Sequence, residues 1–147
     1  MNHKNNHIEF SFYELSLLSF LRESHPDKAG DISLIKSRAT EVAEAYSNAF
    51  MDGYSVPECA DIANQSLYRG LHFSKHDTIV GVLRDEFWDV VSSDVLKDTA
   101  IRLQPKLEEV FANYSPGDDF ATTAAYERLR TELTGAIQLI WEENGSL

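Results

Sequence analysis

Ser11-Phe12-Tyr13-Glu14 opens an apolar run with helical spacing, and the same arrangement recurs at Ser55-Val56-Pro57-Glu58 and Ser74-Lys75-His76-Asp77. In each stretch the serine hydroxyl can accept a hydrogen bond from the amide three residues on. The carboxylate can accept one from the amide of the serine itself. Such capping boxes mark the N-termini of helices, so the sequence predicts an all-α protein.

Caps and apolar periodicity together predict a flexible N-terminus at residues 1–10 and one compact domain of about six helices at residues 11–145. Pro105 lies inside the fifth helix, where it removes an amide donor, so we expect that helix to split near Gln104. The predicted spans are approximately 11–24, 31–52, 55–69, 74–91, 94–113 and 123–144.

The spacing also predicts which side chains face inward. We expect Phe10 to pack on Leu15 as a hydrophobic staple, and Trp88 to lie in or near the core unless it anchors a partner. Further predicted core positions are Tyr13, Leu17, Phe20, Leu21, Ala43, Tyr46, Phe50, Cys59 and Val91.

Composition limits the possible functions. The 147 residues include 24 acidic and 13 basic side chains, which give a net charge of −11 and disfavour direct binding to nucleic acid or anionic lipid. No apolar run approaches the roughly 18 residues of a membrane span, and the single Cys59 excludes an internal disulfide. We therefore expect a cytoplasmic protein. Most acidic residues are typical of solvated helix faces, although an acidic surface could meet a basic partner.

Two helix junctions carry the candidate site residues, which are Arg22, His25, Arg69, His72, Lys75 and His76. If these side chains converge, they could bind a small anion or ligand. The alternative is that they are ordinary helix-end residues, because arginine at a helix C-terminus is already favoured by the helix dipole. His72 and His76 have the spacing of metal ligands, but the cap at Ser74 places His72 outside the helix. We expect no metal and no cofactor.

No nucleophile elbow of the form Gly-x-Ser-x-Gly occurs, so no catalytic residue is predicted and a function without catalysis is favoured. His25-Pro26-Asp27-Lys28, followed by Glu44-Ala45-Tyr46, resembles the loop region of J-domain cochaperones. That family presents a basic helix before the loop, whereas here only Arg22 is basic in the helix. A cochaperone role therefore stays an alternative.

A second resemblance covers nearly the whole chain. The segments 13–26, 69–78 and 131–135, which read YELSLLSFLRESHP, RGLHFSKHDT and TELTG, resemble the bacterial family called domain of unknown function 1896. The resemblance implies small all-α proteins and a frequent setting in conjugative and other mobile elements. It implies no activity and no site residue.

The sequence thus favours an acidic accessory protein that binds a protein partner. The main alternative is a protein that binds a small ligand, an anion or a metal at the two junctions, with or without catalysis there. An acidic mimic of nucleic acid that occupies a basic cleft is another. A homodimer is also left open, because symmetric dimers are the commonest assemblies.

Overall fold

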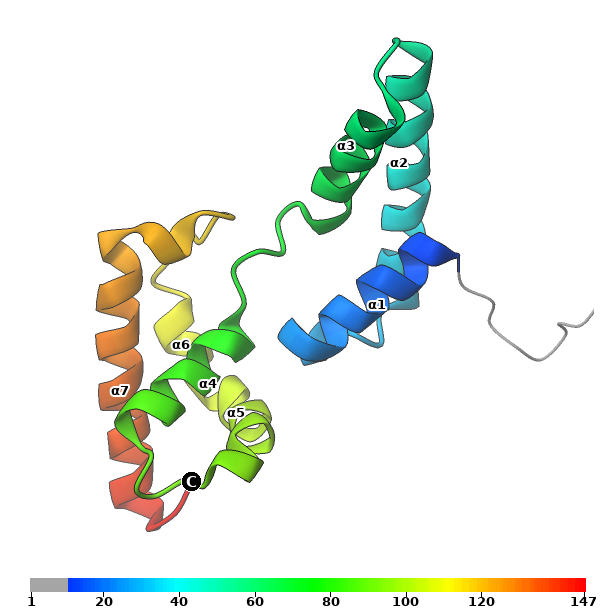
Figure 1. Cartoon of the computed structure of the whole chain (residues 1–147). Coiled ribbons are helices and arrows are strands. Elements are labelled where there is room, and N and C mark those ends of the chain that lie inside the picture. Colours follow the sequence, from blue (N-terminus) through cyan, green and yellow to red (C-terminus); the bar gives the residue numbers. More distant parts are fainter. Residues whose placement is uncertain (1–10) are drawn as a thin grey trace, which may run out of the picture. The chain divides into compact units, whose positions relative to one another are not determined.

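Helices make up the regular structure of residues 11–147, which the computed structural model describes (Figure 1). No strand occurs in this range, so the all-α prediction is confirmed. The chain divides between Arg69 and Gly70 into two compact units, and one domain over residues 11–145 stays a prediction. In chain order the elements, with η marking a 3₁₀ helix, are α1 (Phe12–Ser24), η1 (Pro26–Lys28), α2 (Ile32–Met51), α3 (Val56–Tyr68), α4 (Lys75–Glu86), η2 (Ser93–Val95), α5 (Leu96–Leu103), η3 (Gln104–Leu107), α6 (Glu108–Phe111), η4 (Phe120–Thr122) and α7 (Ala124–Asn144).

The helix starts lie where the capping boxes predict them. The Glu14 N–H donates to Ser11 Oγ at 3.3 Å, and the Ser11 N–H donates back to Glu14 Oε1 at 2.6 Å. A second complete capping box begins at Ser55, and the Asp77 N–H donates to Ser74 Oγ at 2.9 Å. These bonds satisfy amides that the first helical turn leaves without an intrahelical partner.

The first unit consists of α1 and a helical hairpin formed by α2 and α3, which lie side by side (Figure 1). Cys59 is fully buried, as predicted, and its thiol donates to Tyr54 O at 3.7 Å. Tyr13 and Phe20 of α1 are only half-buried. The core of this unit comprises Leu17, Leu21, Ile35, Ala39, Val42, Ala49, Cys59, Ala63 and Leu67.

Two core predictions for α2 are wrong. Ala43 is exposed, and Phe50 is 59% exposed although the spacing from Tyr46 places it on the inward face. The inward stripe continues at Ala49 instead, three residues after Tyr46, and Ala49 is only 4% exposed. Phe50 lies in the last turn of α2, one residue beyond the buried Ala49, so its side chain points away from the buried stripe of that helix.

Residues 1–10 lie outside the described residues, so the flexible N-terminus and the staple of Phe10 stay predictions. The described partner of that staple, Leu15, is 53% exposed.

None of the described helices is long and apolar enough to cross a membrane.

The second unit packs α4, α5 and α7 around its own core, which extends from Ile79 to Ile137. At one end of this core, Phe73 packs edge-to-face on Phe120 and Tyr126, with ring centroids 5.2 and 6.3 Å apart. The predicted split of the fifth helix is confirmed, because α5 ends at Leu103 and the 3₁₀ helix η3 carries Pro105.

The prediction that α4 extends to Val91 is wrong. The helix ends at Glu86, and Phe87 leaves helical geometry with φ −128° and ψ 27° while its N–H donates to Leu83 O. Phe87 and Val91 are still buried, because the Val91 N–H bonds back to Phe87 O in a turn. The same turn directs Trp88 outward, where it is 73% exposed, so its predicted place in the core is also wrong.

Candidate functional site

Three of the six candidate residues belong to the first unit. Arg22 is exposed in the last turn of α1, and His25 caps that helix by donating its N–H to Leu21 O at 2.7 Å. The His25 residue is buried, with its ring centroid 5.7 Å from that of Phe20. Arg69 caps α3, and its Nη2 lies 3.6 Å from Glu41 Oε1. Cap and ion-pair contacts of this kind stabilise helix ends.

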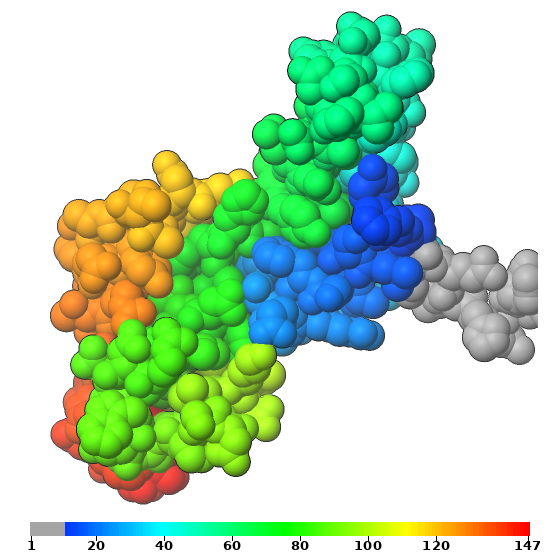
Figure 2. All heavy atoms as spheres, viewed as in Figure 1, coloured from blue at the N-terminus to red at the C-terminus, as the bar shows by residue number. Residues whose placement is uncertain are grey.

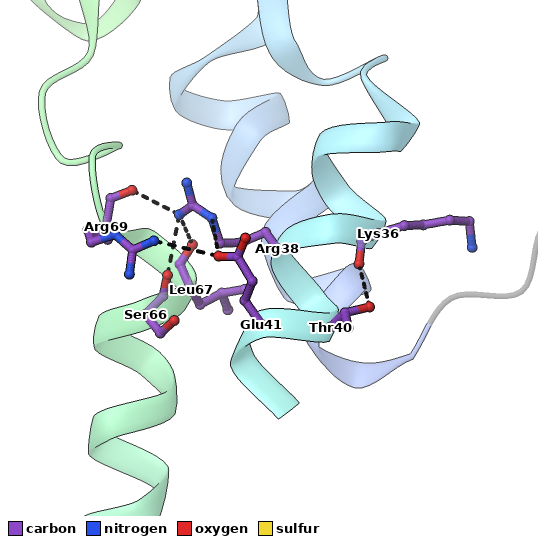
Figure 3. A network of polar contacts seen from close by, with 7 residues as sticks. All are labelled: Lys36, Arg38, Thr40, Glu41, Ser66, Leu67 and Arg69. Atoms are coloured by element: carbon purple, nitrogen blue, oxygen red, sulfur yellow. Dashed lines mark hydrogen bonds and ion pairs between the residues drawn. The ribbon is translucent and has the colours of Figure 1, made fainter. Parts of the chain in front are cut away.

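Arg38, which the sequence analysis did not select, organises the end of α3 (Figure 3). Its Nη1 donates to three main-chain oxygens, those of Ser66, Leu67 and Arg69, at 3.3, 3.0 and 2.8 Å. Its Nε lies 3.9 Å from Glu41 Oε1, and only 15% of the side chain is exposed.

The arginine therefore occupies the position of a C-terminal cap, although it comes from the neighbouring helix α2. The last carbonyls of an α-helix lack intrahelical donors, and a buried cation there also complements the helix dipole. One sequence signal was available, since Arg38 lies three residues after the buried Ile35 and so borders the inward stripe of α2.

The other three candidates belong to the second unit. His72 is exposed, whereas His76 is 3% exposed in the first turn of α4. Lys75 lies between them, and its Nζ is 2.7 Å from Glu108 Oε1 and 5.4 Å from the centroid of the Phe111 ring. This cation joins the start of α4 to α6 by an ion pair and a cation–π contact.

Asp118 is a second residue that the sequence analysis did not select. Its Oδ2 accepts from the Gly70 N–H at 2.9 Å, and its Oδ1 accepts from the His72 N–H at 3.2 Å. The carboxylate comes from the loop between α6 and η4, which contains Pro116 and Gly117. It fixes the segment before α4, where Gly70 has φ +79°.

The six candidate residues are thus divided between the two units, three in each. The contacts of Arg69 and Lys75 are with glutamates inside their own units. In the described part of the chain, no group of three or more His, Cys, Asp or Glu side chains could hold a metal ion. Ligand binding by these six residues stays a prediction.

The triplet that resembles a J-domain loop has a local structural role. His25 ends α1, Pro26 begins the 3₁₀ helix η1, and Asp27 lies 3.6 Å from Lys28 Nζ. Pro26 suits the first position of a helical turn because its missing N–H would have no partner there. The cochaperone interpretation stays an alternative prediction.

An open polar groove of about 800 Å³ lies in the first unit beside the start of α1. Glu14 and Lys36 form an ion pair at its wall, with Nζ 3.3 Å from Oε2. The hydrogen bond from the Ser11 N–H, assisted by Lys36, lowers the pKa of Glu14 even though partial burial opposes this shift. Ser11, the N-cap of α1, also lines the groove, and every other described lining residue comes from α2. Among these described residues no second ion pair occurs.

Comparisons with known proteins agree with this fold. The family described as "Domain of unknown function (DUF1896)" matches residues 5–146. The chain is similar to the crystal structure of protein PG0816 from Porphyromonas gingivalis, with 40% sequence identity and a TM-score of 0.87. That match covers 90% of each chain. No curated protein matches the sequence. The chain belongs to the DUF1896 family, a family of unknown function.

Proposed function

We propose that this protein acts without catalysis, as an acidic accessory factor that binds a basic partner protein in the setting of a bacterial mobile element. The net charge of −11 supports a basic partner, because opposite charge speeds encounter and disfavours acidic competitors. The mobile-element setting rests on the family resemblance alone.

The exposed Trp88 carries this proposal. Tryptophan is the side chain most enriched at the energetic centres of protein interfaces, and its exposure to water is unfavourable for an isolated domain. Neither the helix cap at Phe87 nor the turn to Val91 requires a large aromatic side chain at the position between them.

The surroundings of Trp88 suit a basic protein segment. Trp88 lines an open cavity of about 430 Å³ together with Asp89, Val90 and Val95. Residues 85–98 include five acidic side chains and one lysine, and all five acidic residues are exposed. Glu86 is exposed at the end of α4, so its charge can meet a partner.

One basic side chain, Arg102, also lines this cavity and could offset its negative charge. Arg102 donates from Nη1 to Leu147 O at 2.5 Å and from Nη2 to Thr99 Oγ1 at 3.2 Å. These two bonds commit its guanidinium to the protein itself. Asp85 is paired with Arg84 and Arg130, so the other four carboxylates, which outnumber Lys97, determine the sign of the local field.

The proposal is tested by affinity capture from the host lysate at low and high salt, followed by mass spectrometry. Trp88→Ala is compared with Phe12→Ala, because Phe12 is a similarly exposed aromatic residue, at 76%, in the first unit. We expect a basic protein that is captured by the wild type and by Phe12→Ala, and is lost with Trp88→Ala and at high salt. The complex must then form again from the purified components.

Three results would contradict the proposal. The first is capture of the same proteins by Trp88→Ala. The second is light scattering that shows a dimer of the wild type and a monomer of Trp88→Ala, which would make this face a contact between copies. The third is a copurifying anion or metal that disappears when His72 and His76 are replaced by Ala, which would favour the junction residues instead.

A further inference from the structure

We propose that the turn between α2 and α3 is a second docking surface, which binds a protein segment that combines apolar and basic side chains. We call this surface the hairpin tip and define it as Phe50, Met51, Asp52, Tyr54 and Val56. It lies in the first unit, apart from Trp88 in the second, so it goes beyond the proposed function and would stand if Trp88 bound nothing.

The four large apolar side chains of the hairpin tip are all exposed. Met51 is 81% exposed, Phe50 59%, Val56 58% and Tyr54 48%. They lie within seven consecutive residues, 50–56, which form the turn that joins α2 to α3 (Figures 1 and 2). Methionine and aromatic side chains are enriched at protein interfaces, and a contiguous apolar patch is a mark of such sites.

The backbone holds these side chains in one arrangement. The Tyr54 N–H donates to Ala49 O, and the Gly53 N–H donates to Phe50 O, which is the bond pattern of a Schellman motif. Gly53 has φ +94°, which lets the chain turn without strain. The capping box at Ser55 then starts α3 at once.

A rigid tip of this kind loses little conformational entropy when a partner binds, and preorganised surfaces gain affinity for that reason. The exposed side chains are therefore not those of a loose loop.

The charge around the tip identifies the chemistry of the partner. Beyond Glu41, which is paired with Arg38 and Arg69, residues 42–68 contain four acidic side chains and no lysine or arginine. The four are Glu44, Asp52, Glu58 and Asp61. Asp52 lies inside the tip and is exposed. Lysine or arginine beside an apolar anchor would complement this surface and fix the orientation of the partner.

The same charge argues against a membrane as the occupant. Apolar tips that insert into bilayers are accompanied by basic residues that attract anionic headgroups. No basic residue is available between Ala39 and Tyr68, so anionic lipid would be repelled. A protein segment is the occupant that both the apolar side chains and the charge favour.

The test uses the full chain and a synthetic amphipathic helix made only of leucine and lysine as the probe. Binding is measured by calorimetry, and the contact site is mapped from backbone amide NMR signals. We expect the signals of residues 49–56 to shift. Phe50→Ser with Met51→Ser should weaken binding by at least about tenfold, because two central apolar contacts are lost.

Leu139→Ser is the matched control, since Leu139 is 61% exposed on α7 in the other unit. It should leave the affinity unchanged. Trp88→Ala should leave the shifts of residues 49–56 unchanged, which separates this proposal from the previous one. A helix with glutamate in place of lysine should bind at least about tenfold more weakly, and added salt should weaken the lysine helix.

The proposal is overturned if the double tip variant binds the lysine helix as tightly as the wild type does. It is also overturned if the glutamate helix binds equally well. Sedimentation that shows a dimer dissociated by the tip substitutions would make the tip a contact between copies. Binding to phosphatidylserine vesicles that the same substitutions abolish would make it a membrane contact. Circular dichroism of each variant checks that the fold is retained.

Discussion

Arg38 Nη1 lies 2.8 Å from the carbonyl oxygen of Arg69, although the two residues are 31 positions apart in the chain. Most of the Arg38 side chain is buried, so water competes little with these carbonyl oxygens for its N–H groups. The end of α3 therefore depends on a side chain from α2, and the hairpin is closed by this contact as well as by its apolar core.

Replacing Arg38 by Met should lower the free energy of unfolding by about 1–3 kcal/mol, because three carbonyl oxygens lose a charged donor while the apolar stem is kept. Chemical denaturation followed by circular dichroism measures the change. Arg22→Met, at an exposed position on α1, is the control and should stay within about 0.5 kcal/mol of the wild type. Equal stability of the two variants would show that the Arg38 contacts contribute nothing.

Asp118→Asn should loosen the segment before α4. The carboxylate uses one oxygen for the Gly70 N–H and the other for the His72 N–H, whereas an asparagine amide has a single acceptor oxygen. We expect a loss of about 0.5–1.5 kcal/mol in the free energy of unfolding. Hydrogen exchange should become faster at Gly70 or His72, and Asp119→Asn should leave both amides protected as in the wild type. Unchanged protection in Asp118→Asn would contradict this account.

Features set by neighbouring residues could be predicted from the sequence, and features set by distant ones could not. The caps at Ser11 and Ser55 and the split at Pro105 depend on groups within one helical turn. The exposure of Phe50 and Trp88 depends on where neighbouring helices end, which periodicity alone does not encode.

The same distinction explains which polar residues were missed. Arg38 and Asp118 form hydrogen bonds with main-chain groups up to 31 and 48 positions away in the sequence. No local sequence motif predicts contacts over such distances. Arg69 and Lys75 were noticed because they stand beside helix ends, but their glutamate partners also lie in other helices. Spacing can therefore nominate charged residues at junctions, and only the tertiary structure assigns their contacts.

Glu14→Gln should destabilise the protein at neutral pH by about 0.5–1 kcal/mol, and the difference should shrink in acid. The pKa of Glu14 is lowered in the folded state, chiefly by the Ser11 N–H, so the folded protein binds fewer protons than the unfolded chain. Its stabilisation is complete above the ordinary glutamate pKa of about 4.3 and is lost as the pH falls through the lowered value.

Denaturation of the wild type and of Glu14→Gln at several pH values from neutral to acid measures this difference. Glu44→Gln removes the same charge from an exposed position on α2 and is the control. At acid pH the protonated Glu14 carries no charge, so the wild type and Glu14→Gln should become similar in stability. A difference between them that stays constant across this range would contradict the linkage.

Two glycines of α7, one inside the helix and one at its C-terminal cap, should respond oppositely to replacement by alanine. Gly135 lies inside the helix, and apart from its chain neighbours and the nearby backbone of α7 no atom lies within 4 Å of where a Cβ would stand. Gly145 caps the helix with φ +71°. Gly135→Ala should stabilise the protein by about 0.5–1 kcal/mol, because alanine loses less entropy in a helix. Gly145→Ala should destabilise it by about 1 kcal/mol, because a side chain is strained at positive φ. Thermal unfolding of both variants tests the pair, and shifts of the same sign would show that α7 does not end at Gly145 as described.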